Sequence, residues 1–129
     1  EKFGEFAQKE IDICIQPELD PTSEQLTMGE VINVLNELTD GNAIMVTDVG
    51  QHQMVTCRYA KFNQTKSNIT SGGLGTMGFA LPAAIGAKLG APERTVIAII
   101  GDGGFQMTLQ ELGTIMQCNI DIKIIILNN

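Results

Sequence analysis

Two polar patterns in this sequence follow runs of β-branched and aliphatic residues, and both have the residue types of a metal and phosphate site. Residues 101–104 are Gly-Asp-Gly-Gly and follow the run 95–100. Asn128 and Asn129 follow the run 122–127. Carboxylate and amide oxygens are hard ligands suited to Mg²⁺, and glycines let backbone N–H groups approach an anion closely. A magnesium ion carrying a phosphorylated cofactor is the simplest object that uses all of these groups.

The two aliphatic runs predict fully buried parallel strands, and the segment between them predicts a helix. Its apolar residues recur at helical spacing: Phe105, Leu109, Leu112 and Met116. A strand–helix–strand unit brings both strand ends to the same edge of a sheet. Asp102 and Asn129 are 27 positions apart in the sequence, and we still expect them to face one small site.

The rest of the chain alternates helices and strands in the same way. Thr27 and Glu30 have capping-box spacing and predict a helix that ends at Asp40 and Gly41. Further expected elements are a strand over 43–49, a helix from there toward Tyr59, a short strand over 67–70 and a helix from Phe79. The alternation predicts an α/β fold with an open, mostly parallel sheet, helices on both faces, and ligands outside the carboxyl ends of the strands.

The first 25 residues are expected to form a linker from a preceding domain. Residues 1–10 predict the tail of a helix, 11–15 a brief edge strand, and 17–25 a connector. The folded domain then spans 26–129. Because the chain begins without methionine and ends at a strand terminus, we expect a segment of a longer protein. Its cofactor domain would be incomplete at the C-terminal end.

Composition and charge exclude several classes of function. With 43% hydrophobic and 18% charged residues, the chain has a globular composition. A formal net charge of −7 argues against a nucleic-acid partner, and it requires metal and backbone dipoles to hold any diphosphate. The three cysteines are widely spaced and predict reduced thiols in the cytoplasm. Every apolar run is of strand length, so no membrane span or signal peptide is expected.

A second strand end and a glycine-rich turn carry further candidate residues. Gly50, Gln51 and His52 follow the first predicted strand at a helix start, where N–H donors point toward an anion. His52 is the only histidine, and a core-filling role is its alternative. Met77 is a flexible apolar side chain inside the turn 71–78, where it has little core to fill, although ordinary packing would also explain it.

Two other classes of function stay open on the residues alone. Residues 73–78 match G-x-G-x-x-G, and Asp102 follows Gly78 by 24 positions, which is typical of nicotinamide or flavin dinucleotide binding. Against this, the strand before these glycines is short and polar, whereas such folds begin with a buried strand. The other alternative is a cofactor-free α/β scaffold for oligomerisation, in which residues 101–104 form only a tight turn.

The pattern Gly-Asp-Gly followed by Asn-Asn resembles the signature of thiamin-diphosphate-dependent enzymes. Longer stretches, 49–54, 71–78 and 104–112, are similar to the large catalytic subunits of acetolactate (acetohydroxyacid) synthases. The resemblance covers residues 26–129. Pyruvate oxidase and glyoxylate carboligase share the general pattern and are the nearest alternatives.

The resemblance implies a role for each candidate site residue. Asp102 and the side chain of Asn129 would ligate Mg²⁺, and Gly75 would accept a hydrogen bond from the aminopyrimidine through its carbonyl. Met77 would hold the cofactor in a bent form. The cofactor-binding set that the resemblance implies is Gly50, Gln51, His52, Gly75, Thr76, Met77, Gly101, Asp102, Gly103, Gly104 and Asn129.

The implied reaction is decarboxylation of pyruvate, followed by ligation to pyruvate or 2-oxobutyrate in branched-chain amino-acid biosynthesis. The resemblance places no catalytic residue on this segment, since the activating glutamate belongs to another domain across a dimer interface. It also implies FAD elsewhere in the full-length protein, a homodimer or tetramer, and a small regulatory subunit. We therefore expect the isolated segment to be inactive.

Overall fold

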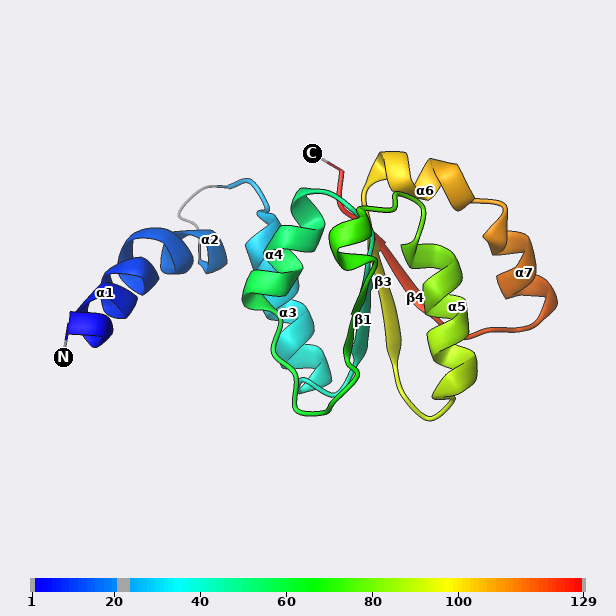
Figure 1. Ribbon diagram of the computed structural model, residues 1–129, viewed down its shortest axis with the longest axis horizontal. Coiled ribbons are helices and arrows are strands. Elements are labelled where there is room, and N and C mark those ends of the chain that lie inside the picture. The colour runs from blue at the N-terminus through cyan, green and yellow to red at the C-terminus, as the bar shows by residue number, and fades with distance from the viewer. Residues whose placement is uncertain (1, 21–23, 129) are drawn as a thin grey trace.

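One sheet of four parallel strands forms the centre of the molecule (Figure 1). The computed structural model describes residues 2–20 and 24–128. The strands are β1 (Ile44–Thr47), β2 (Asn68–Thr70), β3 (Val96–Ile100) and β4 (Lys123–Ile126), in the order β2-β1-β3-β4. All three strand pairs are parallel, so the predicted open α/β sheet is confirmed.

Helices cover both faces of the sheet, as predicted (Figure 1). One face carries α3 (Met28–Thr39) and α4 (Gln51–Tyr59), and the other carries α5 (Ala80–Gly90), α6 (Asp102–Thr108) and α7 (Glu111–Gln117). A 3-10 helix, Gly72–Leu74, lies in the turn between β2 and α5. The chain therefore forms three layers, with the sheet in the middle.

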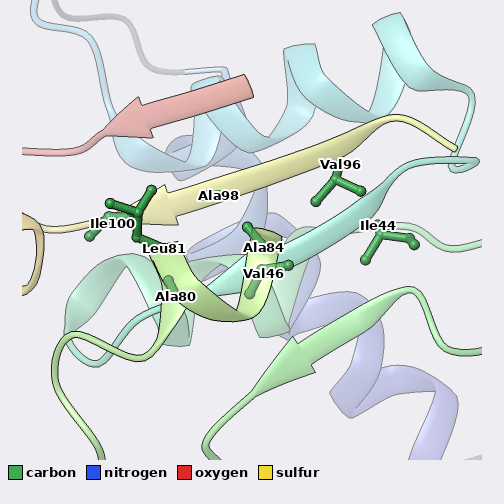
Figure 2. Packing of buried hydrophobic residues seen from close by; sticks show 8 residues of the cluster. All are labelled: Ile44, Val46, Ala80, Leu81, Ala84, Val96, Ala98 and Ile100. Carbon is green, nitrogen blue, oxygen red and sulfur yellow. The ribbon is translucent and has the colours of Figure 1, made fainter. Parts of the chain in front are cut away.

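The core divides into two clusters because side chains alternate along each strand. Ile44 and Val46 of β1 pack with α5, while Met45 between them packs with α3 and α4. Strand β3 alternates in the same register. Figure 2 shows the α5 side, where side chains of β1 and β3 meet one face of α5. The buried residues of this cluster are Ile44, Val46, Ala80, Leu81, Ala84, Val96, Ala98 and Ile100.

Helix α3 begins where its capping box predicts. The Thr27 hydroxyl accepts from the Glu30 backbone N–H at 3.2 Å, and the Glu30 carboxylate accepts from the Thr27 N–H at 2.8 Å. These bonds satisfy two of the N–H groups that a helix start leaves without partners. The helix ends at Asp40, which itself adopts a left-handed φ of 46°, followed by Gly41 at 65°.

The N-terminal segment differs from the expectation. Residues Lys2–Glu10 form helix α1, Ile11–Ile15 continue it as a π-helix, and Gln16–Leu19 form the short helix α2. The predicted edge strand at 11–15 is wrong, because helical hydrogen bonds satisfy its backbone where no neighbouring strand does. Within the expected connector, Pro17 occupies the first turn of α2.

This N-terminal segment docks on α3 and α4 at its C-terminal end. Ile15 and Leu19 pack against the cluster on that side of the sheet. The Thr27 hydroxyl donates to the Glu18 carbonyl at 2.7 Å, and the Tyr59 hydroxyl donates to the Glu18 carboxylate. Helix α1 extends away from the sheet layers (Figure 1), and its Phe3 is 92% exposed.

Two further expectations near the C-terminus need correction. The single helix predicted between the last two strands is divided into α6 and α7, because the chain turns at Leu109 and Gln110 through i→i+3 hydrogen bonds. Strand β4 is parallel as predicted, but it is only half-buried. It lies at an edge of the sheet in the described part of the chain.

The strand order locates the place where a ligand fits. From β1 the chain moves to β2 on one side, and from β3 it moves to β4 on the other, so the connections diverge between β1 and β3. In open α/β sheets, ligands bind at such a switch point, beyond the carboxyl ends of the strands. Both predicted anion-binding segments, 50–52 and 101–104, begin there. Among the residues described, no helix is long and apolar enough to cross a membrane.

Candidate functional site

Three segments meet beyond the carboxyl ends of β1 and β3. The first is the start of α4, with Gly50 as its N-cap, and the second is the start of α6, with Gly101 as its N-cap. The third is the glycine-rich turn 71–78 before α5. Each helix start presents N–H groups without intrahelical acceptors, and such groups favour an anion.

Asp48 is the centre of this junction, and it is not among the residues predicted from the sequence. Its side chain directly follows β1 and is 0% exposed. The Oδ1 atom accepts from the backbone N–H of Val49 at 2.9 Å and of Gly78 at 3.0 Å, and Oδ2 accepts from the N–H of Ala80 at 2.9 Å. A buried carboxylate is costly unless it is hydrogen-bonded, and here both oxygens have donors. Its signal in the sequence is a charged residue inside the mostly apolar run 43–49 that is predicted as a strand.

Two glycines are required because the segments approach so closely. A Cβ on Gly104 would lie 2.5 Å from Asp48 Oδ1, so α6 can start here only with glycine at its third position. Gly78 has a φ of 83°, and a Cβ there would lie 3.0 Å from Thr108 Cγ2 of α6. The turn 71–78 therefore rests both on Asp48 and on α6.

His52 is buried between the two glycine-containing strand ends. It is 5% exposed, and a Cβ on Gly50 or on Gly101 would lie 2.9 or 3.0 Å from its Cε1. Its Nε2 is buried and has no hydrogen-bond partner among the described residues. Burial lowers the pKa of His52 below 6.5, and the nearby Asp48 charge opposes this shift. The structure thus brings His52 to the predicted site, with a free ring nitrogen.

The glycine-rich turn contributes Met77 to the same place. Met77 is 46% exposed, and its Cε lies 3.5 Å from where a Cβ on Gly103 would be. Gly75 adopts a left-handed φ of 58° and ends the 3-10 helix. Thr76 is exposed and donates its N–H to the Ser71 hydroxyl at 3.0 Å, which fixes the turn. Met77 is thus adjacent to the start of α6, whereas Gly75 and Thr76 lie on the exposed part of the turn.

Asp102 differs from Asp48 in having no partner within residues 2–20 and 24–128. It is exposed at the first position of α6, and its carboxylate accepts no hydrogen bond from any described residue. A carboxylate in this position is available to a cation. No group of three or more His, Cys, Asp or Glu side chains within 2–20 and 24–128 could hold a metal ion alone. A metal here would need other oxygens in addition to Asp102.

The remaining predicted residues lie at the margin of this site or outside the description. Asn128 is exposed at the end of β4, next to a hollow of about 180 Å³ that Leu26 and Met28 also line. Gln51 is exposed and lines another hollow, of about 310 Å³, with Glu18 and Val55. Asn129, the predicted second metal ligand, lies outside the described residues.

A sheet switch point with glycine-rich turns and the unpartnered Asp102 carboxylate is typical of α/β domains that bind a phosphorylated cofactor. The family model described as thiamine pyrophosphate enzyme, C-terminal TPP binding domain, matches residues 48–129. The chain belongs to this family; thiamine pyrophosphate is thiamin diphosphate under another name.

The chain is also similar to particular enzymes of this class. It is 50% identical to the acetolactate synthase large subunit of Lactococcus lactis over 110 residues, which are 85% of this chain and 19% of that protein. It is 56% identical to chloroplastic acetolactate synthase 1 of Nicotiana tabacum over 98 residues, 76% of this chain and 15% of that protein. It is 47% identical to the acetolactate synthase isozyme 3 large subunit of Escherichia coli over 110 residues, which are 85% of this chain and 19% of that protein. The chain thus spans about a fifth or less of these relatives.

The dinucleotide alternative does not agree with these findings. The strand before residues 73–78 is β2, a three-residue edge strand with no fully buried residue. A dinucleotide-binding turn follows a central buried strand instead. The family match starts at Asp48 and includes this turn, so the glycines belong to a thiamin diphosphate domain.

Proposed function

We propose that the protein containing this chain is an acetolactate synthase. It would condense pyruvate with pyruvate or with 2-oxobutyrate, giving 2-acetolactate or 2-aceto-2-hydroxybutyrate for branched-chain amino-acid biosynthesis. The observation that carries the proposal is the meeting of three segments, the starts of α4 and α6 and the turn 71–78, in a chain of the thiamine pyrophosphate family, with the carboxylate of Asp102 unpartnered among the described residues. The names of the relatives support the choice of reaction within this family.

The diphosphate half of the cofactor would lie between the starts of α4 and α6. Backbone N–H groups of Gly103 and Gly104, and donors from Gly50, Gln51 and His52, would hold the diphosphate. The buried Nε2 of His52, which has no partner among the residues described, supports this assignment, because an unpaired buried polar atom is costly. With a net charge of −7, the chain needs Mg²⁺ to neutralise a bound diphosphate.

Asp102 and Asn129 would provide the protein ligands of that magnesium ion, together with diphosphate oxygens. The exposed, unpartnered Asp102 carboxylate fits this role. Gly101 would support the metal site as the N-cap of α6, where its extended backbone directs the chain into the helix.

The turn 71–78 would hold the aminopyrimidine half. Gly75 would offer its carbonyl, Thr76 would line the site, and Met77 would support the bent form of the cofactor. The position of Met77 beside Gly103 supports this role, because it brings the two halves of the site together. When bound, the cofactor would supply the carbanion and electron sink of the reaction, while the protein would supply position and electrostatics.

Other parts of the activity would come from outside this chain. We infer an activating glutamate on another domain, contributed across a homodimer or tetramer interface, and FAD bound elsewhere in the full-length protein. Residues 26–129 would form the cofactor domain and residues 1–25 a linker. A small regulatory subunit and a cytoplasmic location complete the proposal, and the chain alone would be inactive.

Calorimetry on the full-length protein tests this function. Thiamin diphosphate should bind in the presence of Mg²⁺ and much more weakly with EDTA, and pyruvate should yield acetolactate. Tight binding of NAD or FAD at this domain without Mg²⁺ would contradict the proposal. Binding of no cofactor at all would favour the scaffold alternative. Pyruvate turnover to acetyl phosphate, or activity on glyoxylate alone, would indicate pyruvate oxidase or glyoxylate carboligase instead.

A further inference from the structure

The buried carboxylate of Asp48 has no charged partner in a hydrogen bond or ion pair among the described residues. Besides the N–H of the adjacent Val49, its donors are backbone N–H groups from distant parts of the chain, 30 and 32 positions away at Gly78 and Ala80. Both of its oxygens are therefore directed at the end of the glycine-rich turn and the first residue of α5. Asp48 thereby fixes the turn to the carboxyl end of β1.

The same carboxylate also limits how closely α6 approaches. Its oxygen Oδ1 lies 2.5 Å from the position that a Cβ on Gly104 would take, which means that the first turn of α6 packs directly on it. On the other side, Gly78 packs on Thr108 of α6. The carboxylate, the turn and the helix form one tightly packed junction, so a change at the carboxylate would displace the turn relative to the helix.

The two sides of this junction carry different parts of the proposed site. The turn presents Met77 and Gly75, which would contact the aminopyrimidine. Helix α6 presents Asp102 and Gly103, which would contact the metal and the diphosphate. Among the described residues, no hydrogen bond or ion pair joins Asp48 to Met77 or to Asp102, so Asp48 would act on cofactor binding only through the junction.

We propose that Asp48 is a positioning residue that sets the distance between the aminopyrimidine half and the diphosphate half of the cofactor site. This inference rests on the proposed function. Its consequence is specific: a ligand that occupies both halves depends on Asp48, whereas a ligand that occupies only the diphosphate half does not.

The test compares two ligands in the full-length protein, thiamin diphosphate and inorganic diphosphate, each with Mg²⁺. In the Asp48→Asn variant, an NH2 group replaces one of the two accepting oxygens and cannot accept from the backbone N–H that it faces, so the junction must shift. We expect the Kd of thiamin diphosphate to rise by about tenfold or more, whereas the Kd of inorganic diphosphate changes by less than about twofold. Equal losses for both ligands, or no loss for either, would overturn the inference.

A matched control separates positioning from general loss of stability. Asn36 is also buried and also joins backbone segments, since it donates to the Tyr59 carbonyl at 2.9 Å and accepts from the Lys61 N–H at 2.8 Å, away from the cofactor site. The Asn36→Ala variant should lower the melting temperature and leave both Kd values unchanged. A selective loss of thiamin diphosphate affinity in this control would also count against the inference.

Gly78→Ala provides a second variant in case Asp48→Asn does not fold. It leaves the carboxylate intact and displaces the turn from α6 at a left-handed φ. The same ligand selectivity is expected, and equal weakening of both ligands would overturn the inference. If the wild-type protein binds neither ligand, the proposed function has failed. If the wild-type protein binds both ligands and the variants weaken both equally, only the positioning role of Asp48 has failed.

Discussion

Asp48 and Asp102 each follow a buried parallel strand at the same edge of the sheet, and their environments are opposite. Asp48 is inaccessible and has three backbone donors, whereas Asp102 is exposed and has no partner within the described residues. Both oxygens of the first carboxylate have donors, and this carboxylate stabilises the junction of three segments. The second has free oxygens for a ligand. The comparison shows that residue type and strand-end position do not by themselves identify a ligand; the supply of donors does.

The largest expected effect is the loss of stability in the Asp48→Ala variant. Removing the carboxylate leaves the buried N–H groups of Gly78 and Ala80 without acceptors, and the free energy of unfolding should fall by about 3 kcal/mol or more. Urea denaturation of the full-length protein measures this change. Asp102→Ala is the matched control, and it should cost less than about 1 kcal/mol, the usual size of a helix N-terminal charge effect. Equal losses in the two variants would break the comparison.

The reverse order is expected for cofactor binding. The Asp102→Ala variant should lose at least about 10–100-fold in Mg²⁺-dependent thiamin diphosphate affinity, the range that metal sites lose even when only outer partners are removed. Titration calorimetry with and without Mg²⁺ measures it. Asp121→Ala is a suitable control, because this exposed carboxylate pairs with Lys123 at the start of β4, the opposite edge of the sheet. An unchanged affinity in Asp102→Ala would contradict the assignment of this residue to the metal.

The packing of α6 on Asp48 can be tested with two neighbouring glycines. A Cβ on Gly104 would meet Asp48 Oδ1 at 2.5 Å, whereas a Cβ on Gly103 would only touch Met77 Cε at an ordinary 3.5 Å. Gly104→Ala should therefore lower the free energy of unfolding by about 1–3 kcal/mol through overpacking, and Gly103→Ala should cost nothing measurable. Thermal unfolding compares the two. In an Asp48→Ala background the cost of Gly104→Ala should vanish, and persistence of the full cost there would argue against this contact.

The two aspartates also differ in how far the sequence alone predicts their roles. Asp102 was predicted because glycines surround it in the sequence, and the fold was predicted because the Thr27 capping box and the strand periodicity are local signals. Two of the three donors to Asp48 come from 30 and 32 positions away, and no local pattern reveals them. The break at Leu109 was missed for a related reason, since the apolar spacing continues across it. The exposure of β4 depends on its edge position, which only the assembled sheet defines.

The smallest expected effect concerns His52, which is close to Asp48 and has no hydrogen bond at Nε2. Burial lowers its pKa below 6.5, against the opposing charge of Asp48, so the folded protein takes up this proton at a lower pH than the unfolded chain does. The contribution of the neutral imidazole to the free energy of unfolding is therefore fully present above pH 6.5. It decreases as the pH falls from 6.5 toward the lowered pKa, because the unfolded state binds more protons in this interval.

The His52→Gln variant cannot titrate and should lose less stability over this interval, as urea denaturation at several pH values would measure. A wild-type protein with the same pH dependence as the variant would contradict the burial of a neutral imidazole. Saturating Mg²⁺ and thiamin diphosphate should weaken the pH dependence of the wild-type stability. A bound diphosphate beside His52 would favour the protonated imidazole and so add to the effect of the Asp48 charge against burial.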